Sequence, residues 1–378
     1  MIDNVGSGGA ELLLAEFAHV APAVGIELSV ASLQPPLESL PAARRLRARG
    51  VEPAFVPVKS LLSPVDARRV RRHLADVRPD LLHTHLGSAD YFGGLAARSL
   101  GIPQLATIHA DWWPNDLRSR LKTYVMSRTR RHCASYVVAV SESARRAYLA
   151  AGRDRPEHVL TIHNGIPDRP RPGTGNAVRR ELGLRADDLV ATMVSKLRPE
   201  KNFEVAIDAV AHLRARFPTL RLVIAGDGPH EDTVRRHAAP LGETVVMAGH
   251  REDVMELLDA SDVLLQPSRV DAFPTSVLEA MCACVPTVAT ATGGLLEMVS
   301  DGESGLLVRP PVAAESLASA LTTLLEDPGR RSRLATAARR RYERDFTAER
   351  WAERVRALYD CVLDGPARRS PRYSGRLG

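Results

Sequence analysis

Two carboxylates eight positions apart, Asp271 and Glu279, lie on either side of a proline and give the strongest chemical signal in the chain. Pro274 has no backbone N–H and disfavours helix at the residue before it, which predicts that Asp271 lies in a loop. Thr275 or Ser276 can then cap a helix that carries Glu279 in its second turn. The free N-terminus of such a helix favours a phosphate.

The spacing of these two acids indicates binding rather than shared acid/base work. On one helix they would lie roughly 12 Å apart at about 1.5 Å per residue. The carboxylates of a glycosidase flank a single bond at about 5 to 9.5 Å. Asp271 and Glu279 therefore suit two ends of one extended ligand. The alternative without a function is that Asp271 is an ordinary loop acid and Glu279 a solvated glutamate on a helix.

Three cations, Lys196, Arg198 and Lys201, fall within six residues after a strand-like run. Such a turn before a helix can neutralise a diphosphate, with each lysine acting as a point charge. The alternative is a solvated basic turn. Glycine turns end four other segments and offer backbone N–H groups; the alternative for the first of them is a tight strand-to-helix turn. These glycines are Gly8 and Gly9, Gly226, Gly249 before His250, and Gly293 with Gly294.

Histidines stand at the polar ends of two apolar runs, His83 and His85 after the first and His109 after the second. The carboxyl ends of strands are where open α/β sheets bind ligands. Each histidine has a structural alternative. Trp112 and Trp113 follow directly and could form a wall of a binding site or a lid.

The segment from Asp271 onward resembles the signature of retaining GT-B glycosyltransferases of the group 1 family, which reads Glu, seven residues, Glu, then Ala-Met. The resemblance continues in the family's order and spacing through 285–290, 293–297 and 301–308. Asp271 is one methylene shorter than the family's Glu, and Cys284 stands where the family usually has Gly. The basic turn is similar to the family's Arg-Leu-three residues-Lys element, with Lys196 in place of the Arg.

The resemblance implies a role for each candidate residue. Glu279 would hold the nucleotide ribose, Asp271 would lie near the donor sugar ring, and His109 would contact that sugar. The catalytic set is then His109, Asp271, Lys201 and Lys196. The donor-binding set is Gly8, Gly9, Arg198, Gly226, Gly249, His250, Ser276, Glu279, Gly293 and Gly294. The acceptor side holds Trp112, Trp113 and His85.

The implied activity is retaining transfer of a sugar from a nucleotide-diphosphate donor to a hydroxyl acceptor. Glycolipid, exopolysaccharide or other glycoconjugate synthesis is the expected setting. No cofactor is required, and because no Asp-x-Asp occurs we expect no metal. The alternatives are another GT-B activity, such as a nucleotide-sugar epimerase or a phosphorylase, and a two-domain protein that binds a nucleotide sugar without chemistry.

The order of elements predicts an α/β protein of GT-B fold, with two facing Rossmann-like domains and a deep interdomain cleft. Short β-branched runs alternate with amphipathic stretches of helical length. Strands are expected at 27–33, 51–58, 80–85, 104–109, 135–141 and 159–163. We expect an N-terminal acceptor-side domain at 1–167, a linker at 168–185, a nucleotide-sugar domain at 186–346, a helix returning to the first domain at 347–365, and a disordered tail at 366–378. Almost no strand precedes Gly6, so the chain is expected to start several residues late.

Composition and charge bound the location and partners. The chain of 378 residues is 44% hydrophobic and 25% charged, which suits two globular domains. The absence of a bilayer-length apolar run or signal peptide predicts a cytoplasmic protein. Residues 1–170 hold 22 Lys/Arg against 16 Asp/Glu, while residues 171–378 hold 29 of each. The basic excess is either solvated helix surface or a contact with an anionic membrane or phosphate-bearing acceptor, and nucleic acid is not expected. Four cysteines are expected to act as small buried hydrophobes.

Overall fold

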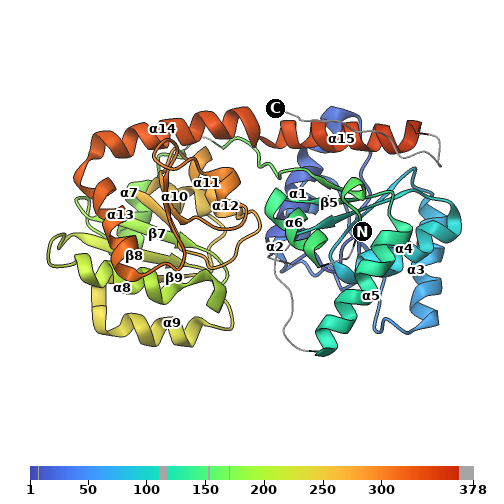
Figure 1. The fold of residues 1–378 in the computed structure, drawn as a ribbon, viewed down its shortest axis with the longest axis horizontal. Coiled ribbons are helices and arrows are strands. Elements are labelled where there is room, and N and C mark those ends of the chain that lie inside the picture. The colour runs from blue at the N-terminus through green and yellow to red at the C-terminus, as the bar shows by residue number, and fades with distance from the viewer. Residues whose placement is uncertain (7, 110–116, 152–153, 170, 366–378) are drawn as a thin grey trace.

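The N-terminal half forms a parallel sheet with helices packed around it (Figure 1). The computed structural model describes residues 1–6, 8–109, 117–151, 154–169 and 171–365. Four strands pair in the order β3-β4-β5-β6, and β1 pairs with β2 beside them. The strands are β1 Ala31–Ser32, β2 Ala54–Phe55, β3 Leu82–His85, β4 Gln104–Ile108, β5 Tyr136–Ala139 and β6 Val159–Thr161. The helices are α1 Gly9–Val20, α2 Pro41–Ala48, α3 Pro64–Val77, α4 Gly87–Leu100, α5 Leu117–Cys133 and α6 Glu142–Ala150.

Ile2 joins the two parts of this sheet. It forms parallel bridges with Ser32 of β1 and His85 of β3, and its side chain is fully buried. The strands predicted at 27–33 and 51–58 are only two residues long in the structure, because only Ala31 and Ser32 pair with Ala54 and Phe55 in a ladder. The other four predicted strands of this half form, with ends that match the predicted limits or lie one or two residues inside them.

The C-terminal half is a six-stranded parallel sheet in the order β12-β11-β10-β7-β8-β9. The order reverses between β7 and β10, and such a switch point opens a crevice at the carboxyl ends of the strands. The strands are β7 Leu189–Val194, β8 Leu220–Ala225, β9 Val245–Gly249, β10 Val263–Gln266, β11 Thr287–Thr290 and β12 Leu306–Val308. The helices are α7 Gly175–Glu181, α8 Phe203–Leu213, α9 Glu231–Ala238, α10 Val254–Asp259, α11 Thr275–Cys282, α12 Leu295–Met298 and α13 Ala314–Glu326.

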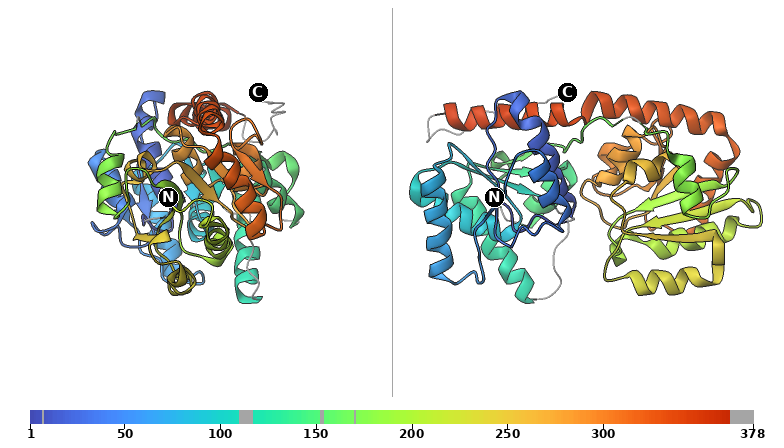
Figure 2. Two further views of the ribbon diagram at one scale, coloured as in Figure 1. Left: turned by 90° about the vertical axis from the view of Figure 1, so that its left-hand side faces the viewer. Right: turned by 180° about the vertical axis from the view of Figure 1, so that it is seen from behind.

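Two consecutive helices connect the domains along one side, as both the front and rear views show (Figures 1 and 2). Helix α14, Pro328–Asp345, lies on the C-terminal domain, and helix α15, Ala348–Asp364, lies on the N-terminal domain. The Thr347 hydroxyl accepts a hydrogen bond from the N–H of Arg350 at 3.4 Å and caps α15. The Trp351 ring of α15 meets the Phe17 ring of α1 edge to face, 5.1 Å between centroids. This apolar contact seats α15 on the N-terminal domain.

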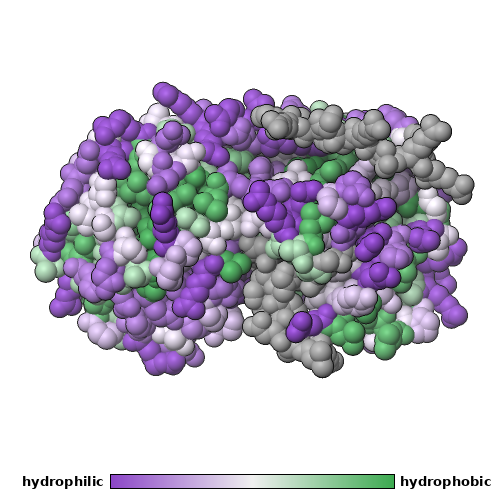
Figure 3. All heavy atoms as spheres, in the orientation of Figure 1, coloured by the Kyte–Doolittle hydropathy of each residue, from purple (hydrophilic) through white to green (hydrophobic). Residues whose placement is uncertain are grey.

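The basic clusters of the N-terminal half do not share one environment. Arg68 and Arg72 of α3 are exposed, as solvated helix residues would be. Arg130 is buried and its Nε donates to Oδ2 of the fully buried Asp90 at 2.6 Å. The arginines of α2 form ion pairs instead, among them Arg44 with Glu252 and Arg47 with Glu52. Figure 3 shows hydrophobic residues gathered near the lower ends of α3 and α5. The exposed apolar side chains of these two helices include Val65, Leu121 and Tyr124, and the exposed Leu62 lies just before α3.

No helix of the described residues is long and apolar enough to cross a membrane. All four cysteines are free thiols. Cys282 is buried as predicted, while Cys133, Cys284 and Cys361 are only partly buried because each lies at the end of a helix or in the turn that follows one.

Candidate active site

Asp271 lies in the loop after β10, as the proline spacing predicted, and one of its oxygens collects three hydrogen bonds. Its Oδ2 accepts from Nζ of Lys201 at 2.6 Å, from Nε2 of Gln266 at 2.9 Å and from Oγ of Ser268 at 3.1 Å. In the part of the chain that the structure describes, Oδ1 accepts no such bond. Asp271 therefore has one oxygen committed to the protein and one left for a ligand.

Glycine permits the loop of Asp271 to meet the loop after β11. The N–H of Gly294 donates to the backbone oxygen of Asp271 at 2.9 Å. A Cβ at Gly294 would lie 1.8 Å from the oxygen of Ala272, so no other residue fits without moving the backbone. Gly293 beside it adopts a positive φ of 55°. These two predicted glycines thus hold the Asp271 loop in place.

The other predicted cations lie in the turn after β7, opposite glycine turns of neighbouring strands. Nζ of Lys196 donates to Oδ1 of Asp227 at 3.1 Å, and Nδ1 of His250 lies 3.9 Å from the other oxygen of that carboxylate. Arg198 is exposed and lies 3.8 Å from Glu200. Gly226 has a φ of 146°, and a Cβ there would lie 1.9 Å from the oxygen of Ser195. The β7 and β8 loops can approach only because this residue is glycine.

Gly249 and Gly226 join the next pair of loops. Gly249 ends β9 with a φ of 66°, and its backbone oxygen accepts from the N–H of Gly226 at 2.7 Å. Backbone groups at the carboxyl ends of β8 and β9 are therefore fixed relative to each other.

The cap predicted for α11 is wrong in its detail. The helix begins at Thr275, its N-cap is Pro274, and no side chain of the described residues caps it. The Ser276 hydroxyl instead donates to Oε1 of Gln266 at 3.3 Å, because Ser276 is buried against β10. Glu279 lies in the second turn of α11, as predicted.

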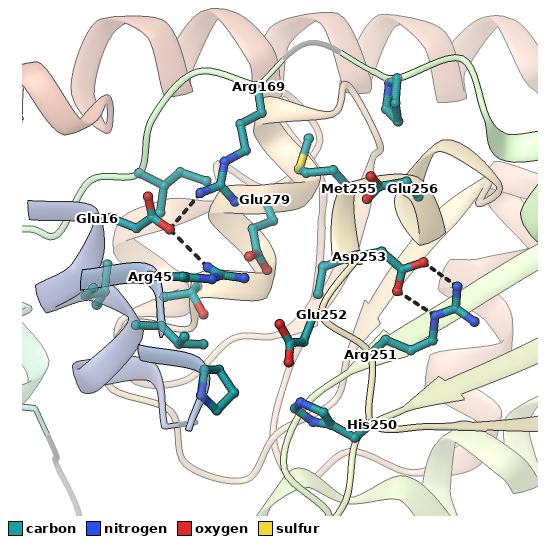
Figure 4. Close-up of a pocket in the computed structure, with 17 residues that line it drawn as sticks. Glu16, Arg45, Arg169, His250, Arg251, Glu252, Asp253, Met255, Glu256 and Glu279 are labelled. Atoms are coloured by element: carbon teal, nitrogen blue, oxygen red, sulfur yellow. Dashed lines mark hydrogen bonds and ion pairs between the residues drawn. The ribbon is translucent and has the colours of Figure 1, made fainter. Parts of the chain in front are cut away.

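Glu279 lines a cavity of about 490 Å³ between the two domains (Figure 4). Its carboxylate points toward Arg45 of α2 in this view, and burial raises the pKa of Glu279 to about 7, partly offset by Arg169 and Arg45. His250 also faces this cavity from the β9 end. The cavity is therefore lined by side chains of both domains, and it is the interdomain cleft that the sequence predicted.

Sequence reasoning missed the ionic cluster on the N-terminal wall of this cavity. Glu16 of α1 is buried and accepts from Arg45 at 3.0 Å, from Arg49 at 2.7 Å and from Arg169 at 2.6 Å. These cations hold the pKa of Glu16 below its usual value although burial raises it. The only available signal was a glutamate on the apolar face of α1, and that signal does not name its partners.

The glycine turn at the N-terminus of α1 lies across the cleft from Lys196. Gly8 is the N-cap of α1 and Gly9 its first residue. A Cβ at Gly8 would lie 2.3 Å from Oε2 of Glu11, so glycine leaves room for that carboxylate. Burial raises the pKa of Glu11, and the charge of Lys196 offsets part of that rise. The predicted donor loops of the two domains therefore face each other.

His109 and His85 meet at the carboxyl ends of β4 and β3. Nδ1 of His85 and Nε2 of His109 are 2.9 Å apart. Burial lowers the pKa of His109 to about 4 and that of His85 well below its usual value. Trp112 and Trp113 lie outside the described residues. Within the described residues there is no group of three or more His, Cys, Asp or Glu side chains placed to hold a metal ion.

Comparison with known proteins explains this arrangement. Residues 176–341 match the family model "Glycosyl transferases group 1" and residues 7–169 match "Glycosyltransferase Family 4". A D-inositol 3-phosphate glycosyltransferase of Stackebrandtia nassauensis is 33% identical over 318 residues, which is 77% of this chain and 71% of the relative. The chain belongs to the group 1 glycosyltransferases.

Two further similar proteins are consistent with this family assignment. An alpha-D-kanosaminyltransferase of Streptomyces kanamyceticus is 27% identical and shares 72% of this chain and 73% of its own. Among solved structures, Anabaena HepE in complex with UDP and glucose superimposes with a TM-score of 0.84 at 23% identity, covering 95% of this chain and 98% of HepE. That likeness shows the fold, which is GT-B as predicted.

Proposed function

We propose that this glycosyltransferase moves a sugar from a nucleoside-diphosphate sugar to a hydroxyl acceptor with retention of the anomeric configuration. The observation that carries the proposal is the Lys201–Asp271 pair, 2.6 Å apart, at the carboxyl ends of β7 and β10. Departure of a nucleoside diphosphate develops negative charge, and preorganised cations stabilise such charge. Lys201 and Lys196 provide those cations without a metal.

The proposal assigns each part of the donor to a part of the cleft. Glu279 holds the ribose in the interdomain cavity, with His250 and Gly249 beside the base. Lys196, Lys201, Arg198 and the N-terminus of α1 at Gly8 and Gly9 face the diphosphate. Asp271 and His109 meet the sugar, with Ser276, Gly226, Gly293 and Gly294 shaping the loops. The UDP and glucose named for the HepE complex support a nucleotide-sugar donor.

The acceptor side belongs to the N-terminal domain. Its basic excess supports a phosphate-bearing or lipid-linked acceptor at an anionic membrane surface. The exposed apolar residues of α5 support it too: Leu121 lies between Arg120 and Lys122, and Tyr124 follows two residues after Lys122. The setting is synthesis of a glycolipid, exopolysaccharide or other glycoconjugate.

A donor panel tests the activity. The purified chain is incubated with UDP-, GDP-, ADP- and TDP-hexoses, and with inositol phosphate or an extracted lipid acceptor. Release of nucleoside diphosphate that depends on the acceptor, together with a product of the donor's anomeric configuration by proton NMR, is expected. Acceptor-independent release of free sugar or epimer supports an epimerase instead, and tight donor binding with no turnover supports a binding protein.

Metal independence has its own test. Transfer should persist in EDTA at the rate measured with Mg²⁺. Complete loss in EDTA, restored by Mg²⁺ or Mn²⁺, would show that lysines alone do not neutralise the diphosphate.

A further inference from the structure

The rings of three histidines, His83, His85 and His109, form a row near the carboxyl ends of β3 and β4. His83 and His85 are two residues apart on β3, so both side chains point to the same face of the sheet. The centroids of their rings are 4.5 Å apart at 28°, and those of His85 and His109 are 5.2 Å apart at 32°. His85 therefore lies between its two neighbours.

His83, at one end of the row, is held by two hydrogen bonds. Nδ1 of His83 lies 2.7 Å from the hydroxyl of Tyr359 on α15, and Nε2 of His83 lies 2.7 Å from Oγ1 of Thr107 on β4. Both ring nitrogens of His83 are thus occupied. The His83 ring cannot turn without breaking a bond, and it gives His85 a rigid surface to stack on.

His109, at the other end of the row, has one ring nitrogen that no described residue bonds. The 2.9 Å contact between His85 Nδ1 and His109 Nε2 needs a hydrogen on one nitrogen and a lone pair on the other. Because the contact uses Nε2 of His109, only Nδ1 of that ring remains for a ligand. No side chain or backbone group of the described residues bonds that Nδ1. In the neutral pair the proton of the shared bond also decides whether Nδ1 of His109 is a donor or an acceptor.

We propose that His85 is a positioning residue, which through this hydrogen bond fixes the orientation and tautomer of His109 and presents Nδ1 of His109 to the donor sugar. The geometry of the pair is independent of the proposed function, and only the identity of the group facing Nδ1 rests on it. This assignment differs from the acceptor-side role predicted for His85, and it is argued from the contact of the His85 ring with His109.

The kinetic arm compares three variants. His85→Ala removes the bond, and His85→Asn places an amide near the position of Nδ1. His158→Ala is the matched control, since His158 is a buried histidine of the same domain that bonds Asp154 and the oxygen of Ala134 instead. We expect His85→Ala to lower kcat roughly 100-fold, because misplacement by about 1 Å has that effect, with little change in donor KM. His85→Asn should recover most of the loss, and His158→Ala should lower the melting temperature without changing kcat.

The spectroscopic arm needs no turnover. Long-range proton–nitrogen NMR of the imidazole rings reports the tautomer of His109, whose signals are assigned by their loss in His109→Gln. Wild type should show one defined tautomer, and His85→Ala should show averaged nitrogen shifts. Unchanged His109 shifts in His85→Ala would overturn the proposal, as would changed shifts with an unchanged kcat. If wild type transfers no sugar at all, the proposed function fails while the nitrogen shifts still decide the pair.

Discussion

Asp271 offers its two oxygens to different partners, and this division shapes what substitutions at the residue should do. Oδ2 is held by Lys201, Gln266 and Ser268, while Oδ1 accepts nothing from the described residues. Lys201 must serve the carboxylate and the proposed diphosphate together. The two residues therefore act as one unit rather than as separate contributors.

Substitutions of Lys201 and Asp271, singly and together, test whether the two residues act as one unit. Lys201→Ala is expected to lower kcat roughly 100-fold or more, because the cation meets charge that grows in the transition state. Asp271→Asn keeps an acceptor for Gln266 and Ser268 but loses the ion pair. The double variant should lose less than the product of the two single losses, since residues in one network are not additive. Steady-state rates of all four proteins check this, and strictly multiplicative losses would contradict it.

The length of the Asp271 side chain gives a separate prediction. Asp271→Glu restores the residue that the family signature carries, so it should retain substantial turnover where Asp271→Ala does not. Transfer rates measured at saturating donor decide this. Equal loss in both variants would show that the Oδ2 network does not tolerate the extra methylene.

Glu279 predicts a pH dependence of stability. Burial raises the pKa of Glu279 from its ordinary value of 4.5 to about 7, so the folded state favours the protonated form. Its contribution to stability is fully present below about 4.5 and is lost as the pH rises through about 7. Glu279→Gln should therefore melt above wild type at pH 8 and close to it at pH 4.5. Thermal melts at both values, without donor, make the comparison, and an equal offset at both would contradict it.

The same variant should weaken donor binding. A ribose contact does not change during the reaction, so its loss raises donor KM more than it lowers kcat. Glu256→Gln, at the C-terminal wall of the same cavity, is the matched control.

At the scale of elements, the N-terminus of α6 is capped from the other domain. Both oxygens of Glu297 accept from α6, from the N–H of Glu142 at 2.8 Å and of Ser143 at 2.9 Å. Nε2 of His163 also lies 2.7 Å from Glu297, and its ring stacks on Phe273. Helix α12 thereby holds α6 and the segment that follows β6 across the domain boundary.

Loss of this contact should loosen the boundary. Glu297→Ala leaves two N–H groups of α6 without this acceptor, which typically costs about 1 kcal/mol for a cap. The melting temperature should fall by roughly 2–4 °C for each kcal/mol. Glu303→Ala, an exposed glutamate of the following loop, is the control and should melt like wild type. No difference between the two variants would show that the cap is not needed.

Elements with strong periodicity could be predicted from the chain, and contacts between distant elements could not. β4, β7 and α15 follow from runs of β-branched or amphipathic residues, and Asp271 and Glu279 follow from their spacing about Pro274. The bonds of Gln266 and Ser268 to Asp271 depend on how tightly the loop after β10 folds back. The partners of Glu16 depend on α1, α2 and the linker meeting, which no local pattern encodes.

At the scale of the whole molecule, the chain passes between the domains twice and the two passages touch. Ile166 and Thr347 form a parallel bridge, and the Tyr342 hydroxyl donates to the oxygen of Ile166 at 2.9 Å. Gly165 makes the contact possible, because a Cβ there would lie 2.3 Å from the oxygen of Thr347.

A methyl group at this point should separate the passages. Gly165→Ala is expected to destabilise the protein by about 1–3 kcal/mol, the usual effect of overpacking a closed site. Gly9→Ala is the control, because its Cβ would meet no atom within 4 Å. Thermal melts of both variants check the prediction, and equal melting temperatures would contradict it.

The two connections between the domains meet at Ile166 and Thr347, so we expect any rotation of one domain relative to the other to have its axis near these residues. Points close to such an axis move least when the domains turn, and distant points sweep the widest arc. Ile166 itself lines the cavity that contains Glu279. The part of the cleft proposed for the ribose lies near this axis, so we expect a turn of the domains to change its width less than that of the outer rim.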